Sequence, residues 1–129
     1  MSVSKVVLDA SALLQALQIE RGAETVAEHL GYAHMSAVNL AEVISKLIDN
    51  GHSLLSARRI VNSLAIKIEE VDEAQAYVAA ALRTPTRKAG LSLGDRICLA
   101  LAAKLGAPVL SADKSWAKLD VGVEVILTR

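Results

Sequence analysis

The chain has 129 residues, of which 53% are hydrophobic and 22% charged, which excludes an intrinsically disordered protein and predicts one folded domain over residues 1–129. Its 14 basic residues balance its 14 acidic residues, so the net charge indicates neither a nucleic-acid nor a membrane partner. The single cysteine excludes a disulfide framework and a CxxC zinc site. Because no apolar run is as long as a signal-peptide core or a membrane helix, we expect a cytoplasmic protein without membrane contact.

Short apolar runs alternate with longer helical segments, a pattern typical of an α/β domain with a parallel sheet. In chain order we expect a strand at 6–8, helices at 10–17 and 23–30, a strand at 33–36, helices at 40–48 and 53–65, a strand at 66–71, a helix at 73–82, a loop over 83–94, a helix at 96–105, and strands at 109–110 and 123–127. The sequence therefore predicts about five short strands that are separated mostly by helices.

The two helices expected at 40–48 and 53–65 carry apolar residues around much of their surface. In the first helix, Leu40, Val43, Ile44 and Leu47 recur at helical spacing. Such a surface indicates either deep burial or an exposed groove that receives a partner helix.

Four acidic residues stand where strands end or helices begin. Asp9 and Asp113 follow the first and fourth strands, and Glu42 and Asp95 lie in the first turns of two helices. In an open parallel sheet these positions share one rim, where ligands bind. Four neighbouring carboxylates need a counter-charge, and Mg²⁺ or Mn²⁺ accepts carboxylate and water oxygens. A metal held in this way activates water and stabilises the charge of a phosphoryl displacement.

Each acid also has a structural interpretation as a helix cap. Asp9 precedes a helix, and Asp113 precedes a turn at 114–117. The other two acids have capping-box spacing, in the pairs Asn39 with Glu42 and Ser92 with Asp95. The common rim favours a joint site, and the capping interpretation stays open for each acid taken singly.

Four segments carry a resemblance to a known family: VLDASALL at 7–14, SAVNLAEV at 36–43, LSLGDR at 91–96 and LSAD at 110–113. They resemble the acidic motifs of PIN-domain ribonucleases, and more closely those of VapC toxins from bacterial type II toxin–antitoxin systems. The resemblance spans the whole chain in order, spacing and length. It implies a three-layer α/β/α fold around a central parallel sheet of about five short strands.

The same resemblance implies a homodimeric endoribonuclease that cleaves RNA and depends on Mg²⁺ or Mn²⁺. A cognate antitoxin would neutralise it, and the protein would contact DNA only through that antitoxin. The catalytic acids would be Asp9, Glu42, Asp95 and Asp113. We expect the three aspartates to hold the metal, partly through water, and Glu42 to orient the attacking water. The hydroxyls that accompany the first and last acids in this family correspond to Ser11 and Ser111, the latter at a position where many relatives carry threonine.

A basic segment borders the expected site. Between residues 83 and 96 the chain carries four basic side chains and one acidic one, and we expect Arg96, Arg87 and Lys88 to contact RNA phosphates. A solvated loop is the alternative interpretation of the same charges. Arg96 is the strongest candidate because it adjoins Asp95.

Two further functions compete with the nuclease. A receiver-like phosphoryl-transfer domain also places aspartates at strand ends, but no lysine directly follows the fifth strand here. A PIN-like module that only binds a partner is the other alternative, and the complete set of acids disfavours it.

Overall fold

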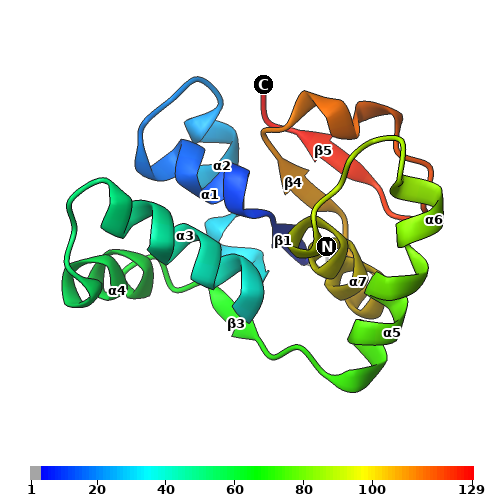
Figure 1. Ribbon diagram of the computed structural model, residues 1–129. Coiled ribbons are helices and arrows are strands. Elements are labelled where there is room, and N and C mark those ends of the chain that lie inside the picture. Colours follow the sequence, from blue (N-terminus) through cyan, green and yellow to red (C-terminus); the bar gives the residue numbers. More distant parts are fainter. Residues whose placement is uncertain (1–3) are drawn as a thin grey trace.

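The computed structural model describes residues 4–129, whose strands form one parallel sheet in the order β3-β2-β1-β4-β5. Figure 1 shows this sheet at the centre of the molecule. The strands are β1 (Val6–Leu8), β2 (Ala33–Ser36), β3 (Lys67–Glu69), β4 (Val109–Ser111) and β5 (Val125–Leu127). The expected α/β fold with five short parallel strands is confirmed, with β1 in the middle.

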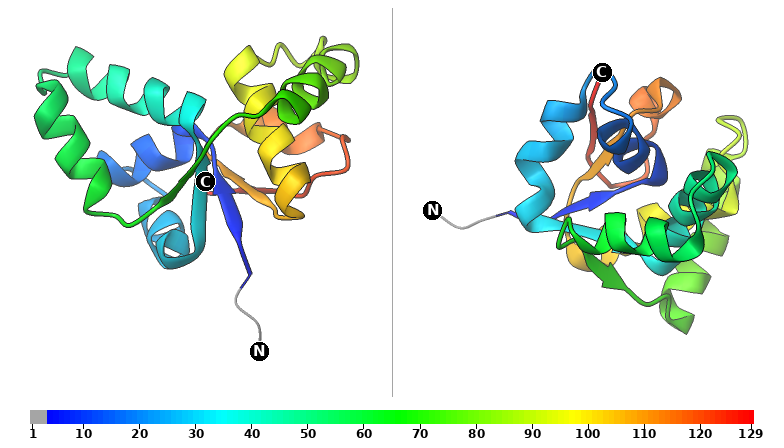
Figure 2. Two further views of the ribbon diagram at one scale, coloured as in Figure 1. Left: turned by 90° about the horizontal axis from the view of Figure 1, so that it is seen from below. Right: turned by 90° about the vertical axis from the view of Figure 1, so that its left-hand side faces the viewer.

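Helices connect all but the last two strands. They are α1 (Ala10–Leu17), α2 (Ala23–His29), α3 (Ala37–Asp49), α4 (Leu54–Asn62), α5 (Glu73–Ala81), α6 (Arg83–Thr86) and α7 (Leu93–Leu105), with short 3₁₀ turns η1 (Leu30–Tyr32) and η2 (Lys114–Lys118). In Figures 1 and 2 the α3–α4 hairpin lies on the opposite side of the molecule from α5 and α6. Within residues 4–129, no helix combines the length and apolarity needed to cross a bilayer.

The central strand shows why the fold has three layers. Successive side chains of a strand point to opposite faces, and all three residues of β1 are buried. Val6 and Leu8 pack in one apolar cluster with Leu13 of α1 and Val43 of α3. Val7 packs in a second cluster with α7. Because both faces of the sheet are covered at its centre, β1 is continuously apolar.

Some predictions about local structure are wrong. The helix expected at 96–105 begins three residues earlier, at Leu93, where the Ser92 side chain caps it. The helix expected at 40–48 begins at Ala37, because the Ser36 hydroxyl accepts a hydrogen bond from the Val38 amide and caps α3 one turn earlier. Asn39 and Glu42 therefore form no capping box. The segment 83–94 is not all loop: it contains α6, whose Pro85 lies in the first turn, where a helix needs no amide donor.

Candidate functional site

Asp9 is the centre of the site. It directly follows the central strand, caps α1, and is only 4% exposed. Its Oδ1 accepts hydrogen bonds from the Ala12 amide at 2.8 Å and from the Ser11 hydroxyl at 2.7 Å, and its Oδ2 accepts one from the Ser111 hydroxyl. The two serines expected to accompany the acids thus both donate to this one carboxylate.

The Asp9 charge is unfavourable in this environment. Burial raises the pKa of Asp9 from its ordinary value of 3.8 to about 6. Hydrogen bonds from Ser111, Ala12 and Ser11 oppose that shift, and the neighbouring Asp95 charge adds to it. No salt bridge within residues 4–129 involves Asp9. A buried carboxylate without a compensating cation is a site that attracts one.

Glu42 is brought to the site by contact between the first turns of α3 and α7. Asn39 donates one side-chain hydrogen bond to Glu42 Oε1 at 2.7 Å and another to the Gly94 carbonyl at 3.1 Å. A Cβ atom on Gly94 would lie only 2.7 Å from Glu42 Oε1. The buried Asn39 and the absence of a side chain at Gly94 therefore set the position of Glu42. Sequence reasoning missed both roles, although the Asn-x-x-Glu spacing was the available signal.

Asp95 lies next to Glu42 at the start of α7. Its Oδ2 accepts a hydrogen bond from the Ser92 amide, completing the capping box that the sequence predicts. Cys98 lies one turn further along α7 and is fully buried. Burial raises the pKa of its thiol, and the charges of Asp9, Asp95 and Glu42 raise it further. Glu42 and Asp95 therefore lie at the N-terminal end of α7, where Gly94 contacts Glu42 and Asp95 forms the cap.

Asp113 joins the group through the serine hydroxyls. Its backbone amide donates to Ser111 Oγ at 3.1 Å, and the adjacent Ala112 amide donates to Ser11 Oγ at 3.0 Å. Its exposed carboxylate caps η2 by accepting from the Ser115 amide and hydroxyl. The capping interpretation thus holds for Asp9, Asp95 and Asp113, and their joint role around one site stays a prediction.

The donor chemistry of this site fits a hydrated hard cation. Within the described chain, no three Asp, Glu, His or Cys side chains are arranged to ligate a metal directly. Asp95 and Asp113 each use one oxygen as a cap and leave the other without a hydrogen bond from residues 4–129. Magnesium typically takes one or two carboxylates and keeps several waters. The expected ligand set of Asp9, Asp95 and Asp113 stays a prediction.

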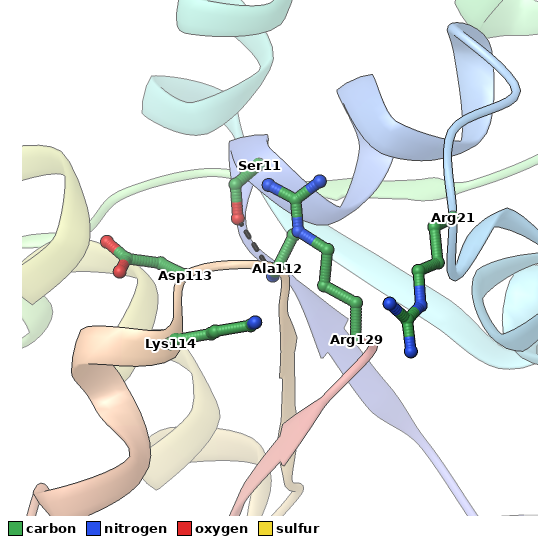
Figure 3. A pocket seen from close by; sticks show the side chains of 6 residues that line it. All are labelled: Ser11, Arg21, Ala112, Asp113, Lys114 and Arg129. Atoms are coloured by element: carbon green, nitrogen blue, oxygen red, sulfur yellow. Dashed lines mark hydrogen bonds between the residues drawn. The ribbon is translucent and has the colours of Figure 1, made fainter.

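The basic residues expected to contact RNA form no salt bridge with the four acids within residues 4–129. Arg96 donates a hydrogen bond to the Ala79 carbonyl at 3.0 Å and so joins α7 to α5. Arg87 and Lys88 are exposed in the turn after α6. Other basic side chains share a pocket of about 650 Å³ with Asp113, shown in Figure 3. Its lining is Ser11, Arg21, Ala112, Asp113, Lys114 and Arg129.

Comparison with known proteins identifies relatives of this fold. A family model described as a PIN domain matches residues 6–122. No curated protein matches the chain in sequence. A toxin–antitoxin complex from Klebsiella pneumoniae superposes with a TM-score of 0.74 at 20% identity, over 97% of this chain and 98% of that chain.

Two further solved structures are similar. DNA-bound VapBC from Salmonella typhimurium has a TM-score of 0.75 at 13% identity, covering 98% of this chain and 100% of that chain. VapC20 from Mycobacterium tuberculosis, a toxin that cleaves the sarcin–ricin loop, has a TM-score of 0.69 at 16% identity, covering 93% and 99%. At these identities the likeness establishes a shared fold.

Proposed function

Because the chain belongs to the PIN domain family, we propose that it is a VapC-type toxin, a hydrolase that cleaves internal RNA phosphodiester bonds with Mg²⁺ or Mn²⁺. The observation that carries this proposal is the buried carboxylate of Asp9, which Ser11 and Ser111 hold in place; burial raises the pKa of Asp9 to about 6. An acid kept in such surroundings at the carboxyl end of a central strand is typical of a functional site. The family match also removes the receiver-like alternative.

The residues of the site have distinct roles in the proposed reaction. Asp9, Asp95 and Asp113 would hold the metal, partly through water. Ser11 and Ser111 orient Asp9 and favour its ionised form, because both donate hydrogen bonds to it. When bound, the metal supplies positive charge for the phosphodiester and the attacking water.

Glu42 would orient the attacking water from α3, across from Asp95 on α7. Asn39 holds one of its oxygens, and Oε2 receives no hydrogen bond from residues 4–129, which leaves an acceptor for a water proton. As that water adds to phosphorus, the bond to one bridging oxygen breaks and the departing oxygen takes a proton. Hydrolysis of this kind needs neither a nucleophilic side chain nor a covalent intermediate.

The proposed partners follow from the same assignment. The Klebsiella and Salmonella structures are toxin–antitoxin complexes, one of them bound to DNA. We propose that this chain, acting as a cytoplasmic homodimer, pairs with a cognate antitoxin and reaches DNA only through it. An apolar groove of about 450 Å³ between α3, α4 and β3 suits the apolar face of an antitoxin helix. It is lined mainly by Leu40, Ile44, Leu54, Val61, Ile66 and Ile68.

Incubation of the purified chain with end-labelled RNA tests the nuclease proposal. We expect discrete cleavage products with Mg²⁺ or Mn²⁺, and none with EDTA. Asp95→Asn should lower the cleavage rate by at least about a hundredfold, because it removes a charge facing Asp9. Glu28→Gln, an exposed acid on α2, is the matched control and should cleave at the wild-type rate.

The contrary outcome identifies the alternative function. If the wild-type chain binds a partner but cleaves no RNA with either metal, the chain is a binding module whose acids only cap helices. If Asp95→Asn cleaves as fast as wild type, the activity comes from a contaminant or from another site.

A further inference from the structure

The pocket in Figure 3 gathers positive charge beside the acidic site. Its cationic side chains are Arg21 from the α1–α2 loop, Lys114 from the start of η2 and Arg129 after β5. None forms a salt bridge with any residue of 4–129. In Figure 3 the Asp113 carboxylate points away from all three. Because the chain as a whole has no net charge, this concentration of unpaired cations is local.

Buried contacts hold the backbone in place at Arg21 and next to Arg129. Gln15 on α1 is 1% exposed, and its amide group donates a hydrogen bond to the Arg21 carbonyl. The same side chain accepts a hydrogen bond from the hydroxyl of Thr128, the neighbour of Arg129. One buried amide thus joins the backbone of the α1–α2 loop to the end of β5.

Gly22 allows that close approach. Its φ of +99° is a conformation that glycine adopts readily, and a Cβ atom there would lie 2.2 Å from the Thr128 carbonyl oxygen. A larger residue would push the α1–α2 loop away from β5 and separate Arg21 from Arg129. Glycine at this position and the buried Gln15 indicate a built arrangement of the pocket wall.

The pocket adjoins the acidic site through Ser11 and Asp113. Ser11 lines the pocket and also donates to Asp9 at 2.7 Å, and Asp113 lines it as well. A polyanion that approaches the four acids is repelled by them unless positive charge lies alongside. Arginine matches phosphate geometry with two parallel donors, and lysine adds a mobile positive charge.

We propose that Arg21, Lys114 and Arg129 form a phosphate-binding subsite that holds the RNA backbone next to the phosphodiester to be cleaved. This inference rests on the proposed nuclease function and names the surface by which that site receives its substrate. It assigns phosphate contacts to residues scattered along the chain, and the contacts expected of the basic segment at 83–96 stay a prediction.

Binding measured without metal tests the subsite separately from catalysis. The probe is a fluorescently labelled RNA oligonucleotide in EDTA, read by anisotropy over a series of salt concentrations. Each of Arg21→Gln, Lys114→Gln and Arg129→Gln should weaken binding by about fivefold. The pocket variant combines these three substitutions. In it, the slope of log affinity against log salt should fall in magnitude by about 2, since each phosphate contact to a single strand contributes about 0.7.

A matched triple variant controls for overall charge. Lys46→Gln, Arg58→Gln and Arg59→Gln remove the same charge from α3 and α4, which do not line the pocket. This control should keep the wild-type affinity and salt slope. If it loses as much affinity as the pocket variant, or if the pocket variant binds like wild type, the subsite proposal is wrong.

Cleavage kinetics distinguish the subsite from the catalytic site. With Mg²⁺, the pocket variant should raise KM by at least about tenfold and change kcat little, because its cations bind substrate and transition state alike. Cleavage with an unchanged KM would overturn the subsite and leave the nuclease standing. A third outcome is that the wild type binds RNA in a salt-dependent way that the pocket variant loses, but cleaves no RNA. That outcome would support the subsite and overturn the nuclease.

Discussion

Asp9 has two roles at the scale of the single residue. It accepts the Ala12 amide hydrogen bond of a helix cap, which favours the ionised form, and it is buried beside Asp95, which disfavours that form. Burial is the larger effect, so the pKa of Asp9 rises to about 6. A cap needs only an acceptor and can stay exposed, as Asp113 does on η2. The burial of Asp9 is therefore what separates it from an ordinary cap.

The raised pKa of Asp9 predicts how stability depends on pH in metal-free protein. The folded state binds the proton more tightly than the unfolded state, whose pKa is 3.8. The stabilisation is therefore complete below about pH 4 and is lost as the pH rises through about 6. From the size of the shift, the contribution of Asp9 to the unfolding free energy should fall by roughly 3 kcal/mol over this range.

Asp9→Asn isolates this contribution, because every other titrating group is shared with the wild type. Urea unfolding in EDTA at a series of pH values should show the variant at least as stable as wild type at neutral pH, with the difference vanishing towards about pH 4. The same variant should lose RNA cleavage. Parallel pH profiles for the two proteins would contradict the prediction, and an unfolded variant would show that Asp9 serves the fold as a cap.

At the scale of elements, the site depends on the contact between α3 and α7. The sequence predicts Glu42 and Asp95 in the first turns of two helices. Because α3 starts at Ala37, Glu42 lies in its second turn, and Asn39 and Gly94 join the two helices. This contact joins residues that are 55 positions apart. Periodicity describes one segment at a time, so it predicts each helix without predicting their contact.

Gly94→Ala tests whether this contact matters for catalysis. The new Cβ would meet the Glu42 carboxylate at 2.7 Å, and a flexible side chain moves aside at little cost. Alanine also favours a helix more than glycine does, so the unfolding free energy should stay within about 1 kcal/mol of wild type. Cleavage should fall by about tenfold or more as Glu42 is displaced.

Gly31→Ala is the matched control, since a Cβ there would meet nothing within 4 Å. It should leave both stability and cleavage close to wild type. Wild-type cleavage by a well-folded Gly94→Ala protein would show that the position of Glu42 is not critical. Denaturant unfolding and initial cleavage rates measure both properties on the same samples.

The elements themselves differ in how far the sequence predicts them. The strands 6–8 and 33–36 and the helix 10–17 are confirmed residue for residue, because apolar runs and helical periodicity identify them directly. The start of α3 is missed because Ser36 ends a strand and caps a helix at once. The contacts of Ser11 and Ser111 with Asp9 support an expectation that came from family resemblance, which periodicity alone would not supply.

At the scale of the whole molecule, a chain with no net charge separates its charges in space. Acids converge on the carboxyl end of the central strand, and Arg21, Lys114 and Arg129 line the adjoining pocket. The sequence indicates a basic segment at 83–96 because those charges are contiguous. The pocket cations come from three distant parts of the chain, so no local count reveals them.

Metal binding should counteract the repulsion among the acids and stabilise the whole fold. A ligand that binds only the folded state at about a hundredfold excess over its Kd adds about 2.7 kcal/mol. Mn²⁺ or Mg²⁺ should therefore raise the Tm of the wild type above its value in EDTA. This increase in Tm should be smaller in Asp95→Asn and Asp113→Asn than in the wild type. It should equal the wild-type increase in Glu28→Gln, whose side chain is exposed on α2.

Differential scanning calorimetry at neutral pH, with each protein titrated with Mn²⁺, measures these increases directly. An equal increase in all four proteins would mean that the ion binds elsewhere and that the acids are helix caps alone. If Asp95→Asn and Asp113→Asn both lose the increase in Tm, the carboxylates of Asp95 and Asp113 act on one ion. Loss in Asp95→Asn alone would exclude Asp113 from the metal site and restrict its role to the wall of the neighbouring pocket.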